Sequence, residues 1–106
     1  MTDALQALES QYILLTINLS DLLAACQTDS DKKAVMTLYV ASRRNYFNCI
    51  NRLFHDDDPD VQALVDQMKE EQSELKAAVA NIGAIAGVIT AITTAVQTGV
   101  ALAAKV

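Results

Sequence analysis

The chain has 106 residues, of which 52% are apolar, and it carries a formal net charge of −5 at pH 7. This length suits one domain with a single core and is too short for two. The acidic balance opposes general attraction to nucleic acid or to anionic lipid, because both require a basic surface. Only one proline and three glycines interrupt the sequence, which favours long helices. We therefore expect residues 1–106 to form a single all-α domain.

The first predicted helix spans residues 3–26, and Thr2 or Asp3 can cap its start. Its apolar residues recur at alternating spacings of three and four, which is a heptad seam for packing on a neighbouring helix. The seam consists of Leu5, Leu8, Tyr12, Leu15, Leu19, Leu22 and Cys26. A secondary apolar patch outside the seam consists of Ile13, Leu14 and Ile17. We expect a helix with two apolar sides to contact more than one neighbour.

The second predicted helix spans residues 31–55, after an N-cap at Ser30, and forms an antiparallel hairpin with the first. Its wide apolar side is expected to supply most of the core and consists of Val35, Met36, Tyr39, Val40, Tyr46, Phe47, Ile50, Leu53 and Phe54. Arg43 falls on this side, where we expect it to pair with an acidic group. Arg44 and Arg52 point outward, and a solvated or ion-pairing face explains them better than nucleic-acid binding.

Cys26 and Cys49 are the only two cysteines. In the predicted hairpin they lie roughly 20 Å apart, because each residue adds 1.5 Å along a helix. This separation is beyond the reach of a disulfide, so we expect both as reduced core residues.

The motif HDDDPD marks the start of the third predicted helix, because Asp58 can cap a helix whose first residue is Pro59. No proline or polar loop follows, so we expect one continuous helix of about 46 residues, roughly 70 Å long. The predicted architecture is an antiparallel helical hairpin packed on this long third helix. The alternative is a compact four-helix bundle in which the third helix breaks near Gly83–Gly87. We favour the continuous helix because the segment ANIGAIAG lacks polar turn residues, although Gly83 can act as a C-cap.

Residues 77–104 form a charge-free apolar segment within this helix, longer than the roughly 20 residues that cross a bilayer. Many alanines and threonines keep its hydropathy near the usual threshold for a membrane span. Small residues recur at every fourth position from Gly83 to Ala103, which provides a strip for close approach of another helix. Ile and Val form a ridge beside the strip, and Thr and Gln form the opposite face. The predicted interface or membrane contact consists of Ile82, Gly83, Gly87, Ile89, Ala91, Ile92, Ala95, Val96, Gly99 and Val100.

The acidic cluster that follows His55 has alternate carboxylates, as a calcium loop does. It lacks the central glycine, and Gln67 stands where the bidentate Glu is expected. Helix capping explains the cluster more simply. The sequence has a single His, no paired metal-ligand spacing and no glycine-rich phosphate loop. We therefore expect no catalytic residues, no metal, no cofactor and no small-molecule substrate.

The charge-free segment leads to the hypothesis of a non-enzymatic helical interaction or assembly protein. Its C-terminal helix would mediate homo-oligomerisation, binding of a partner helix or membrane association. In composition this Gly/Ala-rich helix is broadly similar to apolar helices of helical pore-forming toxins and secretion translocators. The alternative is a compact soluble four-helix adaptor, such as an immunity protein, antitoxin or chaperone, in which the segment is core. The acidic N-terminal residues predict no cleavable signal peptide, which leaves cytoplasmic and exported locations open, with membrane association allowed in either.

Overall fold

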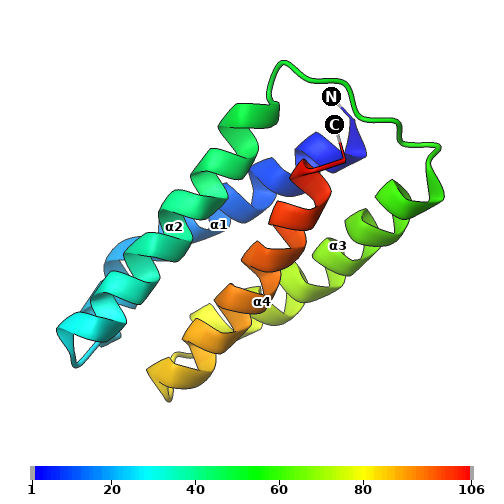
Figure 1. The fold of residues 1–106 in the computed structure, drawn as a ribbon. Helices are drawn as coiled ribbons and strands as arrows, with labels where there is room; N and C mark the ends of the chain where they lie inside the picture. The colour runs from blue at the N-terminus through cyan, green and yellow to red at the C-terminus, as the bar shows by residue number, and fades with distance from the viewer. Residues whose placement is uncertain (1, 106) are drawn as a thin grey trace.

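The computed structural model describes residues 2–105 of the chain as four helices joined by short connections (Figure 1). They are α1 (Asp3–Ala25), α2 (Asp29–Cys49), α3 (Pro59–Ala80) and α4 (Ile85–Ala103). No strand occurs among these described residues, and the predicted all-α class is confirmed.

Side chains placed just before three of the helices set their first residues. Thr2 and Thr28 each accept a hydrogen bond from the backbone N–H three residues later, at 3.2 and 3.1 Å. Asp58 Oδ1 accepts one from the N–H two residues later, at 2.8 Å. Each bond satisfies an N–H that the first turn of a helix leaves without a partner. The cap at Asp58 confirms the prediction, whereas α2 begins at Asp29, earlier than predicted, because its cap is Thr28 and not Ser30.

The helices form two antiparallel hairpins, α1 with α2 and α3 with α4 (Figure 1). Between the hairpins, α1 packs along α3 and α2 packs along α4, while α1 and α4 meet across the centre. Within the described residues α2 and α3 make no contact, so these two helices occupy opposite corners of the bundle. The segment 50–58 crosses one end of the bundle to join them, and both ends of the chain lie at that same end (Figure 1).

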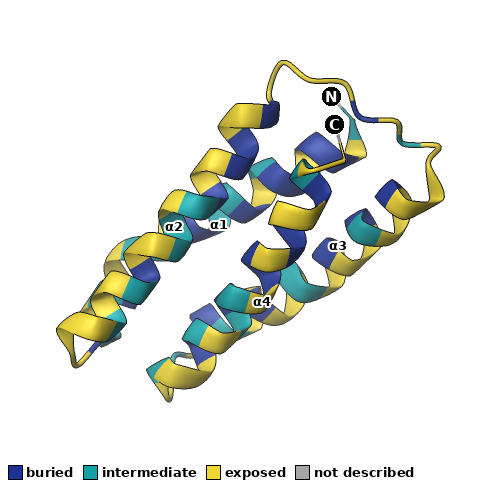
Figure 2. Cartoon of the chain, in the orientation of Figure 1, coloured by how far each residue is buried: buried dark blue, intermediate teal, exposed yellow. Residues whose placement is uncertain are grey.

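The core consists of two clusters of buried apolar side chains, one toward each end of the bundle, and Figure 2 shows the buried faces turned inward. The first cluster, at the end crossed by residues 50–58, consists of Ala4, Leu5, Ala7, Leu8, Tyr46, Cys49, Phe54, Val61, Val65, Met68 and Leu102. The second consists of Leu15, Leu22, Cys26, Val35, Leu75, Val79, Val88, Ile92, Ala95 and Val96. The two cysteines therefore lie in different clusters, both buried and free as predicted, and burial raises the pKa of each thiol.

The predicted continuous third helix is wrong, because α3 ends at Ala80 and α4 begins only at Ile85. The structure has the alternative architecture, the compact four-helix bundle. Its longest dimension is 43 Å, so a continuous helix of roughly 70 Å would have left its second half in water. Folding back instead buries four large apolar side chains of α4, which are Val88, Ile92, Val96 and Leu102. Each stabilises the fold by roughly 1.5–3 kcal/mol, which exceeds the cost of interrupting a few helical hydrogen bonds worth about 1 kcal/mol each.

The turn between α3 and α4 is stabilised by apolar burial and not by polar turn residues. Asn81 leaves the helical region at φ −142° and ψ 74°, and Ala84 precedes α4 at φ −90° and ψ 116°. Gly83 has no positive φ, so it does not act as the left-handed C-cap considered from the sequence. Ile82 and Ile85 pack against the second cluster and hold the turn from either side of this glycine.

Two polar side chains, Gln11 and Asn45, enter the centre of the bundle against Gly99. Gln11 is 2% exposed, and its Nε2 donates a hydrogen bond to the carbonyl of Ala95 in α4 at 2.8 Å. The Oε1 of Gln11 and the Nδ2 of Asn45 have no hydrogen-bond partner within the described residues. A Cβ at position 99 would lie 3.0 Å from that Oε1 and 3.2 Å from that Nδ2. The glycine therefore provides the room in which both amides fit.

Alanine should act differently at two glycines of α4. Gly87 has open space where a Cβ would stand, so Gly87→Ala should raise the free energy of unfolding by about 0.5–1 kcal/mol through helix propensity. Gly99→Ala gains the same propensity but overpacks against Gln11 and Asn45, at a cost of about 1–3 kcal/mol. Urea denaturation should place Gly99→Ala at least about 1 kcal/mol below Gly87→Ala. Equal stability of the two variants would contradict the packing at position 99.

Candidate functional site

The residues predicted as an interface in the C-terminal segment mostly face the inside of the bundle. The buried members are Ile92, Ala95, Val96 and Gly99. The half-buried members, which pack toward the second cluster, are Ile82, Ile89 and Ala91. The exposed members are Gly83, Gly87 and Val100. The surface predicted to bind a partner is therefore largely the surface with which α4 packs on its own chain.

The strip of small residues does not follow one face of α4. Each step of four residues turns the strip by about 40° around an α-helix, because four residues exceed one turn of 3.6. Gly83 and Gly87 at its start are exposed, Ala91 is half-buried, and Ala95 and Gly99 are buried. The strip thus winds from solvent into the core, and it provides no single groove for a second helix.

Hydroxyl and amide side chains cover the outer face of α4. Thr90, Thr94 and Gln97 are exposed, and the two threonines donate to the carbonyls four residues earlier in their own helix at 3.0 and 3.1 Å. Thr98 is buried and donates to Oε2 of Glu71 in α3 at 2.8 Å. The polar residues of the segment are therefore accounted for by a wetted helix surface and by the hydrogen bonds of Thr98 with Glu71 and Gln67 of α3.

The hydropathy of α4 also has a structural explanation. Among the described residues this is the one helix long and apolar enough to cross a membrane, with a mean hydropathy of 1.7. Core helices of soluble proteins pass the same test, and 39% of this apolar window is buried inside the bundle. Length and composition are therefore weak evidence for a membrane span.

The secondary apolar patch predicted on the first helix divides between solvent and core. Ile13 and Ile17 are 45% and 73% exposed. Leu14 is half-buried and packs against the second cluster. Two exposed isoleucines remain on the outer side of α1, without the leucine that was expected to extend the patch.

A second heptad seam runs along the outer side of α2, and we term it the α2 seam. Its members, spaced alternately by four and three, are Met36, Val40, Arg43, Phe47 and Ile50. The four apolar side chains are between 39% and 48% exposed, and Figure 2 shows exposed residues along this side of the helix. A narrow stripe with this spacing is the geometry by which one helix packs on another in a coiled coil.

The wide apolar side predicted for the second helix therefore consists of two stripes, and the expectation that it supplies most of the core was wrong. Val35, Tyr46 and Phe54 are buried, whereas the apolar members of the α2 seam face solvent. A helix at the corner of a bundle buries only the surface that faces its two neighbours. The spacing of the α2 seam is visible in the sequence, but it merges with the inward stripe until the neighbours of α2 are known.

Aromatic side chains hold Phe47 in a fixed position on the α2 seam. Its ring lies 5.7 Å from that of Tyr12 and 5.2 Å from that of Tyr46, with the rings edge to face in both pairs. Tyr12 in turn stacks on Tyr46 at 6.0 Å and lies 5.9 Å from Tyr39. The guanidinium carbon of Arg43 lies 5.6 Å from the centre of the Phe47 ring, within cation–π range. Phe47 is therefore a supported aromatic anchor although it is 48% exposed.

A hydrogen bond beneath this aromatic group ties α2 to α1. The hydroxyl of Tyr46 donates to Oε2 of Glu9 at 2.6 Å. This bond favours the neutral hydroxyl, and together with burial and the negative charge of Glu9 it raises the pKa of Tyr46. The pKa of the neighbouring Tyr39 shifts in the opposite direction, because hydrogen bonding with Thr16 and Tyr12 lowers it.

The α2 seam lies on the basic side of an acidic molecule. Five of the eight Lys and Arg residues fall between positions 32 and 52, a stretch without any Asp or Glu. A shallow groove of about 320 Å³ adjoins the seam and is lined by Lys33, Met36, Thr37, Val40, Ala41 and Arg44. The exposed surface of α3 has an acidic stripe instead, which consists of Asp66, Glu70 and Glu74 and lies beside the exposed Lys69 and Lys76. Because α2 and α3 occupy opposite corners, the two signs of charge are separated across the bundle.

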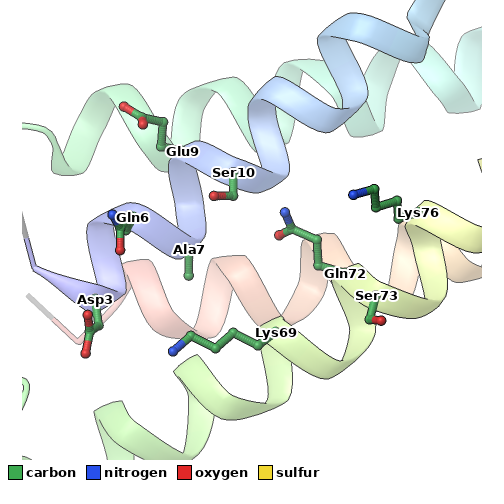
Figure 3. A pocket seen from close by; sticks show the side chains of 9 residues that line it. All are labelled: Asp3, Gln6, Ala7, Glu9, Ser10, Lys69, Gln72, Ser73 and Lys76. Atoms are coloured by element: carbon green, nitrogen blue, oxygen red, sulfur yellow. The ribbon is translucent and has the colours of Figure 1, made fainter.

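A polar groove of about 470 Å³ runs between α1 and α3 (Figure 3). It is lined by Asp3, Gln6, Ala7, Glu9, Ser10, Lys69, Gln72, Ser73 and Lys76. Figure 3 shows Gln72 pointing toward α1 and Glu9 pointing away from the groove, in line with its bond to Tyr46. The lining has two serines but no His or Cys beside them, and no cluster of three metal-ligating side chains occurs in residues 2–105. The groove offers hydrogen-bonding groups without a nucleophile paired to a base.

Removing the Tyr46 hydroxyl should change the response of stability to alkaline pH. A tyrosine whose pKa is higher in the folded than in the unfolded state stabilises the fold. This contribution is complete below the pKa of the unfolded state, about 10, and is lost as the pH rises through the pKa of the folded state. The advantage of the wild type over Tyr46→Phe in urea denaturation should therefore be constant from about pH 7 to 9 and shrink above about pH 10.

Tyr39→Phe is the matched control for this measurement. Because the pKa of Tyr39 is lowered in the folded state, the advantage of the wild type over Tyr39→Phe should grow over the same alkaline range. Parallel curves for the two variants would contradict the hydrogen bond between Tyr46 and Glu9.

The described surface thus has one place where exposed apolar side chains, an ordered aromatic ring and charge of a single sign coincide, and this place is the α2 seam. No protein-family model, no curated protein and no solved structure matches the chain.

Proposed function

We propose that this chain is a non-enzymatic interaction module, a compact four-helix adaptor that binds a helix of a partner protein on the α2 seam. The coincidence of exposed apolar side chains with heptad spacing supports this proposal. Binding hot spots are enriched in aromatic and Arg residues, and the α2 seam pairs Phe47 with Arg43 at its centre. The supporting tyrosines order the ring before binding, which reduces the entropy lost on association.

The position of α4 inside the bundle also favours this surface over the C-terminal helix. Assembly through the predicted interface would require the chain to expose Ile92 and Val96, which are 1% and 3% exposed. It would also break the hydrogen bond from Gln11 to the α4 backbone. The α2 seam is available to a partner without any such rearrangement.

Site-specific photo-crosslinking in the source cells tests the adaptor function. A photoreactive residue replaces Val40 or Ile50 on the α2 seam and, as a matched control, Thr94 or Gln97 on the outer face of α4. All four positions are exposed, so each substitution leaves the core intact. We expect one discrete crosslinked protein from the seam positions and none from the controls, whereas crosslinking from α4 alone, or from neither helix, would overturn the proposal.

A second candidate function is reversible membrane association through α4, which its hydropathy favours. Entry into a bilayer would require α4 to leave the bundle and uncover the apolar residues of both core clusters. The adaptor function needs no such opening, and we therefore place it first.

Truncation and vesicle flotation distinguish the two candidates. If α4 serves as core, a chain that ends at Asn81 should lose its cooperative urea transition, because both clusters lose the apolar side chains that α4 contributes. The full chain should then stay unbound in flotation with neutral or anionic vesicles. A truncated chain that still unfolds cooperatively, together with flotation of the full chain, would favour the membrane function instead.

A further inference from the structure

We propose that the helix bound by the α2 seam is acidic, with apolar residues at its own heptad positions and Asp or Glu beside them. This inference rests on the proposed adaptor function and adds the chemistry of the partner. The juxtaposition that carries it is an apolar heptad stripe set beside basic side chains within residues 32–52, a stretch without Asp or Glu that follows the acidic first turn of α2 at Asp29 and Asp31.

Basic groups lie within the α2 seam and along one side of it. Arg43 lies within the seam, and Lys33 and Arg44 line the adjoining groove with Met36 and Val40. Carboxylates placed along the flank of a partner helix would meet these cations as its apolar residues cover the seam. Flanking charges of this kind set the choice of partner in coiled coils.

Among residues 2–105, neither Arg43 nor Arg44 takes part in a salt bridge. The ion pair found among the described residues joins Lys105 to Asp60 at 3.9 Å, and it involves neither Arg43 nor Arg44. Arg43 is instead held against the ring of Phe47. A partner carboxylate can therefore pair with either guanidinium without breaking a salt bridge of the described residues, which removes one cost of association.

A second copy of the chain fits the α2 seam poorly. Two seams packed against each other would bring Arg43 and Arg44 close to the same residues of the other copy, and like charges repel. The acidic side of α3 has the opposite sign, but its exposed residues are small or polar and would leave Phe47 and Ile50 without apolar contacts. These outward residues are Gln62, Ala63, Asp66, Glu70, Ser73, Glu74 and Ala77.

An extended polyanion or an anionic membrane also fits less well than a single helix. Outside positions 32–52 the chain carries all thirteen acidic residues and only three basic ones, so a large anionic surface would meet repulsion there. Charges separated by more than about 8 Å are largely screened at physiological salt. A helix that lies on the α2 seam alone therefore responds mainly to the basic groups beside it.

The seam also sets the length of the partner helix. From Met36 to Ile50 it spans about 21 Å at 1.5 Å per residue, or roughly four turns. Such a helix would cover one side of α2 without reaching the acidic segment Asp56–Asp60 beyond its end.

Two designed peptides provide the test. Both carry the same four-turn apolar heptad pattern, one with Glu and one with Lys at the flanking positions, and their binding to the full chain is measured by fluorescence anisotropy. We expect the Glu peptide to bind at least about tenfold more tightly than the Lys peptide. Its affinity should fall when the salt concentration is raised from about 50 to 500 mM.

Charge reversal on α2 provides the second arm. Arg43→Glu with Arg44→Glu should reverse the preference, so that the Lys peptide binds more tightly. Lys69→Glu with Lys76→Glu is the matched control, because it makes the same charge change on exposed residues of α3 and should leave the preference unchanged. Phe47→Ser should lower the affinity for the Glu peptide at least about tenfold, because it removes the aromatic anchor.

The outcomes separate this inference from the adaptor function on which it rests. Equal binding of both peptides, or a preference for the Lys peptide, would overturn the inference that the partner helix is acidic. The α2 seam would still be a helix-binding surface. Binding of neither peptide would overturn both. Arginine-dependent flotation with anionic vesicles, in the absence of peptide binding, would identify the α2 seam as a membrane surface and overturn the inference.

Discussion

Burial of the charge-free helix α4 is the constraint on which the rest of this structure depends. Its apolar side chains enter both core clusters, so neither cluster is closed without it. Polar contacts fix the position of the helix, because Gln11 donates to its backbone and Thr98 bonds to Glu71. Directional bonds of this kind restrict a helix to one register, whereas apolar packing alone tolerates several.

The placement of α4 also determines which other surfaces remain uncovered. Since it packs along both α2 and α3, it keeps those helices at opposite corners of the bundle. The outer side of α2 then has no neighbour, and its second heptad stripe stays in water beside the basic residues. A surface of this kind costs solubility, and monomeric proteins seldom keep such apolar stripes without a use for them.

Local signals in the sequence were sufficient for α1, for the start of α3 and, within two residues, for the start of α2, whereas the predicted end of the second helix at residue 55 was wrong because α2 ends at Cys49. Heptad spacing located α1, and the Asp58–Pro59 pair located the start of α3. The break after Ala80 could not be predicted in the same way, because no residue there demands a turn and the turn forms only when Ile82 and Ile85 find the second cluster. Spacing of four likewise suggested a continuous strip on α4, but the rotation of the helix carries Gly99 into the core.

The candidate site was the least accessible part from sequence alone. Apolar residues on two sides of α2 look alike in a sequence, and only the position of the neighbouring helices decides which stripe is buried. The cluster of basic residues was visible, but without the neighbours of α2 it suggested a solvated face. The interpretation of this cluster depends on the exposed ring of Phe47 and on its contact with Tyr12, a residue far from it in the chain.

The segment 50–58 crosses the same end of the bundle at which both termini lie (Figure 1). A peptide linker could therefore join the first described residue to the last over a short distance, and new ends could be opened in an exposed turn at the opposite end, such as the one around Gly83. Such a circularly permuted chain would have the helix order α4, α1, α2, α3 and would retain every helix contact, although its first and last helices would now be the two members of the second hairpin. The order in which the helices are synthesised is in this sense separable from their final packing.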